Sequence, residues 1–271
     1  DTSLLHHLIG SRSLVWNLAK NDIKKKFAGS YFGVVWAFVQ PVITVLLYWF
    51  VFEKGLNSKA TDLRTGIEIP FVLWLTAGLV PWFYFQEALN GGTGVLVEYS
   101  YLVKKVVFQI DMLPVVKMIS ALFTHLFFVA FTIVLFICMG YMPDWYALQV
   151  IYYSFCMILF ATGLVYATSA VTVFFRDMKE VVGILLQIGM WVTPIMWNFE
   201  TMVQIPGWAI AVLKLNPMYY IVSGYRNALI NHIGFWEDMG LTVYFWVVTA
   251  VLLFLGTTVF KKLRPHFADV L

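Results

Sequence analysis

Six long apolar stretches, separated by short polar connections, constrain the fold of this chain more than any other feature. A helix needs roughly 20 mostly apolar residues to cross a bilayer, because lipid offers no partners to unpaired backbone groups. The stretches are too long and continuous for the alternating strands of an outer-membrane barrel. We therefore predict an all-α integral membrane protein with six transmembrane helices, at residues 33–52, 70–89, 118–142, 147–175, 181–197 and 239–260.

The composition agrees with a lipid environment. Only 12% of the residues are charged, whereas soluble globular chains carry roughly 25%. Residues 1–20 contain no unbroken apolar core followed by a small-residue cleavage site, so we expect no removable signal peptide. Cys138 and Cys156 both fall in predicted spans, where we expect small apolar side chains rather than a disulfide or a metal site.

The basic residues predict the orientation of the chain in the membrane. Cytoplasmic loops of membrane proteins are enriched in lysine and arginine. If the N-terminus lies inside, about 13 of the 18 basic residues fall in cytoplasmic segments. We therefore predict a multi-pass protein with both termini in the cytoplasm, as an even number of spans requires.

Residues 1–30 precede the first span, and apolar side chains recur among them at helical spacing between Leu5 and Phe27. This pattern is typical of an amphipathic helix that lies in the membrane interface. A helix packed on the protein's own cytoplasmic surface would show the same pattern. Both arrangements therefore stay open at this point.

Three further segments are predicted to be helical but too short to cross the membrane. Residues 95–111 carry apolar side chains on one face and charged ones on the other, which predicts a short cytoplasmic amphipathic helix. The glycine-rich run at 90–94 is expected to loosen the end of the second span. The apolar pieces at 205–215 and 217–230 are expected to form two short re-entrant helices before the last span, because prolines and a glycine interrupt them.

No catalytic or metal-binding constellation stands out in the sequence. It lacks H-E-x-x-H, G-x-S-x-G and a Walker A phosphate loop, and its carboxylates are not paired at a useful spacing. Gln86 and Glu87 are the most conspicuous polar pair within a predicted span. Ionisable groups inside a membrane are functional candidates, and a solvated position at the cytoplasmic end of the span is the alternative for Glu87. We expect no enzyme activity, cofactor or metal in this chain.

Several short motifs occur in a fixed order along nearly the whole chain. They are KKKFAGSYFGVVW followed by Gln-Pro at 24–41, VPWFYF at 80–85, LVKKVVF and Leu-Pro at 102–114, FFRDMKE at 174–180, Thr-Pro-Ile at 193–195 and LNPM at 215–218. This set resembles the permease subunits of ABC exporters for lipid-linked polysaccharides. One departure is Gln109-Ile110-Asp111, where the family often has Pro-Arg.

The resemblance implies a half-transporter of the bacterial cytoplasmic (inner) membrane. Such a permease pairs with a second copy of itself and with two cytoplasmic ATPase subunits, which supply the ATP and Mg site. Its substrates are O-antigen, capsule or teichoic-acid chains carried on a polyprenyl diphosphate. We expect one permease domain over residues 1–271, with an interfacial segment at 1–30, a six-span core at 31–265 and a cytoplasmic tail at 266–271.

Two other function classes remain as alternatives. A polytopic membrane enzyme acting on polyprenyl-linked sugars would need clustered acidic or histidine side chains at one membrane face. A secondary transporter or channel would need charges near the midplane and inverted repeats. Neither pattern is evident in the sequence, and no nucleic-acid partner is expected.

Three sets of candidate site residues follow from these expectations. The first is expected to dock on the ATPase and consists of Glu98, Tyr99, Tyr101, Lys104, Lys105, Arg176 and Asp177. The second is expected to contact the lipid diphosphate and consists of Arg12, Lys20, Lys24, Lys25 and Lys26. The alternative is that these residues only set the orientation of the chain in the membrane and bind anionic lipid. The third is expected to stack on sugar rings, with lipid anchoring or helix packing as the alternative, and consists of Tyr48, Phe52, Trp82, Tyr84, Phe85, Trp191 and Trp197.

Overall fold

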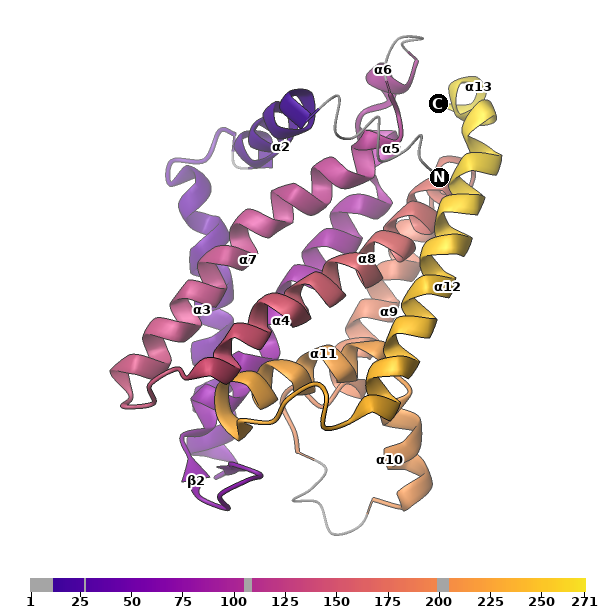
Figure 1. The fold of residues 1–271 in the computed structure, drawn as a ribbon. Coiled ribbons are helices and arrows are strands. Elements are labelled where there is room, and N and C mark those ends of the chain that lie inside the picture. The colour runs from indigo at the N-terminus through magenta and orange to yellow at the C-terminus, as the bar shows by residue number, and fades with distance from the viewer. Residues whose placement is uncertain (1–11, 27, 105–108, 199–204) are drawn as a thin grey trace.

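The computed structural model describes residues 12–26, 28–104, 109–198 and 205–271, without the side chains of Arg12 and Val34. Long helices run between the two ends of the molecule (Figure 1). They are α3 (Trp36–Trp49), α4 (Phe71–Thr93), α7 (Met112–Cys138), α8 (Gln149–Phe174), α9 (Met178–Val192) and α12 (Met239–Leu263). Helix α3 follows the 3-10 turn η1 (Gly33–Val35) and continues into the π-helical turn η2 (Phe50–Gly55), and α8 follows the 3-10 turn η3 (Trp145–Leu148).

Four helical stretches of the described chain are long and apolar enough to cross a membrane. They are Trp36–Gly55, Met112–Cys138, Trp145–Phe174 and Met239–Val270. The prediction of a helical membrane protein is therefore confirmed. Helices α4 and α9 lie at the positions predicted for the second and fifth spans but are not among the four, and α9 has only 15 residues.

The short elements gather at the two ends of the bundle (Figure 1). Near one end lie α2 (Arg12–Lys26), α5 (Val95–Glu98), α6 (Ser100–Val103), η5 (Arg264–His266) and α13 (Phe267–Val270). Near the other lie α10 (Gly207–Lys214), α11 (Pro217–Arg226), η4 (Asn227–Asn231) and an antiparallel pair of two-residue strands, β1 (Ala60–Thr61) and β2 (Glu68–Ile69). Two short helices thus occur where re-entrant helices were predicted, with Asn216 capping α11 through the Met218 N–H.

Small residues allow the bundle to pack closely. A Cβ added to Gly163 on α8 would lie 2.7 Å from the backbone of Leu252 on α12, and one added to Gly256 would overlap the Gly163 carbonyl oxygen. Membrane helices commonly meet at such small residues, because backbones can then approach each other. Helix α4 packs against α7, α8 and α11 and is the most completely enclosed of these helices, with buried side chains along most of its length.

The glycine-rich run at 90–94 does not loosen α4, contrary to the expectation from sequence. Helix α4 remains helical through Thr93. A Cβ on Gly92 would overlap the side chain of Val165, and one on Gly94 would lie 2.6 Å from Lys179 Cε. These glycines therefore serve the close approach of α8 and α9 to the end of α4.

The continuous helix predicted over 95–111 is also not found. Two four-residue helices, α5 and α6, take its place in the described part of this segment. The backbone leaves the helical region at Tyr99 (φ −104°, ψ 30°), whose ring turns into the core. The predicted tail at 266–271 contains α13, and Phe267 packs in the same apolar cluster as Tyr99.

A buried arginine joins three segments at the end of the bundle that carries α11. Arg226, only 6% exposed, donates hydrogen bonds to the carbonyl oxygens of Trp74, Pro194 and Ile195. Its guanidinium also stacks on the Trp74 ring, 3.3 Å from the centroid, and Gly78 leaves the room that it needs. Arg226 thus fixes the turn after α9 against α4 and α11.

Candidate functional site

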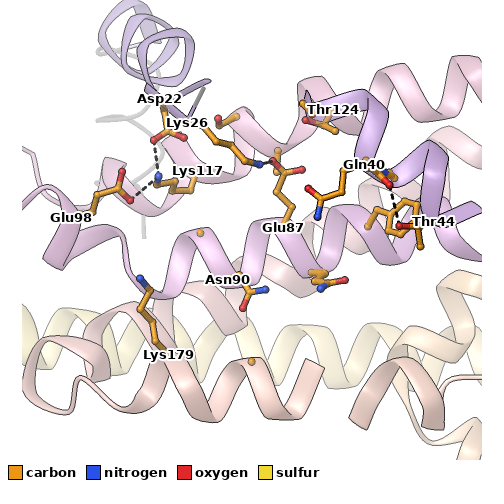
Figure 2. A pocket seen from close by; sticks show the side chains of 18 of the residues that line it. Asp22, Lys26, Gln40, Thr44, Glu87, Asn90, Glu98, Lys117, Thr124 and Lys179 are labelled. Carbon is orange, nitrogen blue, oxygen red and sulfur yellow. Dashed lines mark hydrogen bonds and ion pairs between the residues drawn. The ribbon is translucent and has the colours of Figure 1, made fainter. Parts of the chain in front are cut away.

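A cavity of about 980 Å³ opens between α2, α3, α4, α7 and α9, near the end of the bundle where α2 lies. Charged and amide side chains line one part of it, and Figure 2 shows several of them turned toward its interior. The other part is lined by Tyr48, Phe83 and Met190. A cavity of this composition suits an amphiphilic ligand, with a charged group at one end and an apolar group at the other.

The last residue of α2 and a carboxylate of α4 form an ion pair in this cavity. Lys26 Nζ lies 2.6 Å from Glu87 Oε1 (Figure 2). The Lys26 side chain is 50% exposed and that of Glu87 is 27% exposed. The carboxylate of Glu87 is therefore partly exposed and paired with a lysine from another helix.

A second, more buried network joins α2 to α5 and α7. Lys117 Nζ lies 2.6 Å from Asp22 Oδ1 and 2.8 Å from Glu98 Oε2. The Tyr99 hydroxyl donates to Asp22 Oδ1 at 2.9 Å. Burial, together with this hydrogen bond to a carboxylate, raises the pKa of Tyr99 well above its ordinary value. Tyr99 therefore stays protonated and serves as a hydrogen-bond donor.

Asp22 and Lys117 were not among the predicted site residues, although the sequence carried a signal for both. Val15, Ala19 and Asp22 follow one another at helical spacing, so they share a face of α2. Val15 and Ala19 pack on Met112 and Val116 of α7. An aspartate on a packed face needs a cation opposite, and the lysine directly after Val116 is placed to supply it.

The predicted headgroup residues on α2 differ in their surroundings. Lys20 lies over the Trp16 ring and Lys25 over the rings of Tyr99 and Tyr101, at 5.0 to 5.8 Å from the centroids. Lys24 is exposed, whereas Lys25 and Lys26 line the large cavity. Arg12 is in α2, but its side chain lies outside the described residues.

The residues predicted to dock on the ATPase divide into two groups. Tyr101 is 52% exposed, and Lys104, Arg176 and Asp177 are also exposed. Tyr99 is only 2% exposed, so the expectation that its ring faces a partner is wrong. Glu98 is half exposed but paired with Lys117. Lys105 lies outside the described residues.

Two of the predicted aromatic residues follow each other along the first span. The rings of Tyr48 and Phe52 are 6.4 Å apart, as their spacing of one helical turn predicts. Tyr48 lines the large cavity. Phe52 stacks on Phe71, with ring centroids 6.2 Å apart.

The other predicted aromatic residues do not join this wall. Trp82 and Phe85 line a separate apolar cavity of about 250 Å³ between α4, α8, α9 and α11. Tyr84 is buried and its hydroxyl donates to the Met118 carbonyl oxygen. Trp191 is exposed near the end of α9, and its carbonyl oxygen accepts a hydrogen bond from Trp197 Nε1.

Comparison with known proteins agrees with the motifs. Residues 13–230 match the family described as ABC-2 type transporter. Over 266 residues the chain is 25% identical to the O-antigen export system permease protein RfbA of Myxococcus xanthus, covering 98% of each chain. It is 22% and 20% identical to two proteins of the same name from Klebsiella pneumoniae, each over 258 residues, covering 94% of this chain and 93% of theirs. The family match extends from α2 into η4, and the chain belongs to the ABC-2 type transporter family.

Proposed function

We propose that this chain is the permease subunit of an ATP-driven exporter that moves lipid-linked polysaccharide of the O-antigen type across the bacterial cytoplasmic membrane. The observation that carries the proposal is the similarity to O-antigen export permeases over nearly the full length of both chains. The family match supports a transport subunit, with ATP and Mg bound by a separate ATPase subunit.

The proposed topology has six spans with both termini in the cytoplasm. Helices α4 and α9 supply the second and fifth spans beside the four long apolar stretches. The end of the bundle with α2, α5, α6 and α13 is the cytoplasmic end, because the lysines of α2 and of the end of α12 gather there. Helices α10 and α11 are the two re-entrant helices at the opposite face.

The large cavity is the proposed entrance for the substrate lipid. Lys25 and Lys26 line it beside the exposed Lys24, and ammonium groups form strong charge-assisted hydrogen bonds with phosphate. Its apolar part, which includes Tyr48 and Phe83, suits the first isoprene units of a polyprenyl chain. A polyprenyl diphosphate combines both properties in one molecule.

The proposed contact with the ATPase is the exposed part of the cytoplasmic end. Tyr101 and Lys104 on one segment and Arg176 and Asp177 on another supply it. Tyr99 and Glu98 act behind this surface, since they join it to α2 through Asp22 and Lys117. Movement of the surface would therefore be transmitted to the helix that borders the cavity.

The proposed glycan path runs along α3 between two copies of the chain. Only 6% of the most apolar window of Trp36–Gly55 is buried, compared with 56% for Trp145–Phe174. A second permease beside α3 would cover this surface and close a path that Tyr48 and Phe52 line on the side of α3 that faces their own chain. Stacking of sugar C–H faces on such rings permits sliding, because no single contact is strong.

Reconstitution tests the proposed function. The chain is purified in mild detergent together with the ATPase that accompanies it, and the complex is placed in vesicles that carry a labelled polyprenyl-diphosphate-linked glycan. We expect ATP-dependent appearance of the glycan at the opposite face, measured by lectin binding. Vesicles with ATP and a catalytically inactive ATPase subunit are the matched control. Absence of a co-purifying ATPase, or equal transfer by the inactive complex, would refute the proposal.

A further inference from the structure

The ion pair between Lys26 and Glu87 links the end of α2 to α4 within the lining of the large cavity. Lys26 ends α2, and Glu87 belongs to the last two turns of α4. Both side chains line the cavity, and Figure 2 shows their charged ends in contact. A ligand that reaches Lys26 from the cavity therefore meets Glu87 at the same point.

This ion pair is not needed to hold α2 in place. Val15 and Ala19 already pack α2 on Met112 and Val116, and Asp22 pairs with Lys117. An ion pair as exposed as that of Lys26 contributes little to stability, because water screens it and two long side chains lose freedom. Opening the pair is therefore cheap in free energy.

The charges that line the cavity are balanced. Among its described lining residues, four lysines face four carboxylates, namely Lys25, Lys26, Lys117 and Lys179 against Asp22, Glu87, Glu98 and Glu180. A cavity without excess positive charge has no long-range attraction for an anion. An anionic headgroup gains the ammonium group of Lys26 only by taking the place of Glu87.

We propose that Glu87 is an internal counter-ion that a polyanionic phosphate headgroup displaces from Lys26. This inference rests on the function proposed above and deepens it, because it names the group that sets selectivity at the entrance. A diphosphate carries more negative charge and more acceptor oxygens than one carboxylate, so the ammonium group of Lys26 exchanges its partner. The displaced carboxylate is repelled by the bound headgroup. Headgroups with little charge do not displace Glu87 and are rejected.

Opposite effects of two variants test this inference. The probe is radiolabelled polyprenyl diphosphate, bound to the complex with its ATPase subunit in nanodiscs of zwitterionic lipid. Glu87→Gln should lower the Kd about threefold, because it removes the carboxylate that competes for Lys26. The change stays below tenfold because a partly exposed ion pair is weak. Lys26→Gln should raise the Kd by a similar factor, because it removes the cation.

The possible outcomes separate this inference from the proposed function. If both variants weaken binding, the pair only fastens α2 to α4 and the inference is overturned, while the headgroup site stands. If Lys26→Gln leaves the Kd unchanged, both the inference and the proposed entrance fail. If Glu87→Gln leaves the Kd unchanged while Lys26→Gln raises it, Glu87 is not a competitor and the inference fails alone.

Two controls define the ligand and the site. Glu68→Gln breaks the Lys59–Glu68 pair, which is of similar length at 2.7 Å but lies on the β1–β2 hairpin, and it should leave the Kd unchanged. Polyprenyl monophosphate should bind more weakly than the diphosphate, because it carries less negative charge. Equal competition by inorganic diphosphate would assign the site to a free phosphate anion rather than to a lipid headgroup, and so would overturn the lipid part of the inference.

Discussion

Replacement of Lys117 by methionine should destabilise the protein strongly, because this lysine serves two carboxylates. The side chains of Asp22 and Lys117 are only 7% and 12% exposed. Removing one partner of a buried ion pair costs about 3–5 kcal/mol, since the remaining charge is left without compensation. Loss of the contact with Glu98 adds little to this cost in stability, because the Glu98 side chain is half exposed and can turn to water.

A second variant separates the ion pair from the packing of the lysine stem. Asp22→Asn combined with Lys117→Met removes both charges and keeps an oxygen that accepts the Tyr99 hydroxyl. The double variant should lose about 1 kcal/mol, the net value of an ordinary hydrogen bond. The double variant should therefore be about 2–4 kcal/mol more stable than Lys117→Met alone, because no buried charge is left without a partner.

The free energies come from reversible unfolding in mixed micelles with increasing dodecyl sulfate, followed by tryptophan fluorescence. Lys59→Met is the matched control, because Lys59 pairs with Glu68 at 2.7 Å on the exposed hairpin, where a loss below about 1 kcal/mol is expected. The reasoning is refuted if Lys117→Met costs no more than this control. It is also refuted if the double variant is as unstable as the sum of the single variants.

Two further predictions concern packing and pH. Gly256→Ala should lower the free energy of unfolding by about 1–3 kcal/mol or more in the same assay, because its Cβ overlaps the Gly163 carbonyl oxygen. Gly183→Ala should be neutral or stabilising, because its Cβ meets no atom within 4 Å. Burial opposes ionisation of Asp62, but hydrogen bonds from the side chain and backbone of Thr65 and nearby groups outweigh it and hold its pKa below the ordinary value of an aspartate. The stability that Asp62 provides is therefore present above its unfolded-state pKa and is lost as the pH falls through its folded-state pKa, so Asp62→Asn should cost less stability at acidic pH than at pH 7; an equal loss under both conditions would contradict this assignment.

The helices could be predicted from sequence because apolar run length and helical periodicity are local properties. All six predicted spans coincide with helices, and the two short helices before the last span were also anticipated. The ends were less predictable. Helix α7 begins at Met112, whereas the predicted span began at residue 118, directly after the charged Lys117. The helix continues through Lys117 because this side chain is paired with Asp22 and Glu98 inside the fold. A charged residue interrupts an apolar run in the sequence, but it does not end the helix when the fold supplies a partner of opposite charge.

The candidate site was predictable in composition but not in pairing. Lysines at the end of α2 were expected near a phosphate headgroup, and two of them line the cavity. Their carboxylate partners lie far away in sequence, with Lys26 and Glu87 separated by 61 positions. The apolar pattern of residues 95–111 put Tyr99 on one face with Val95 and Val103, and these three side chains are buried in one cluster, although Tyr99 had also been assigned to the docking surface. The break between α5 and α6 at Tyr99 was not predicted. Such breaks depend on tertiary contacts, which no local pattern contains.

One face of α2 explains why the sequence left two arrangements open for this helix. Val15, Ala19, Asp22 and Lys26 recur at steps of three and four residues, so they lie along one face. Lipid chains satisfy apolar side chains, but the aspartate in the same row is buried in the protein and needs a counter-charge there. The protein supplies that charge with Lys117, while Leu14 and Trp16 remain exposed on other sides of α2. The pairing of Asp22 with Lys117 thus shows that this row of α2 packs on the rest of the protein.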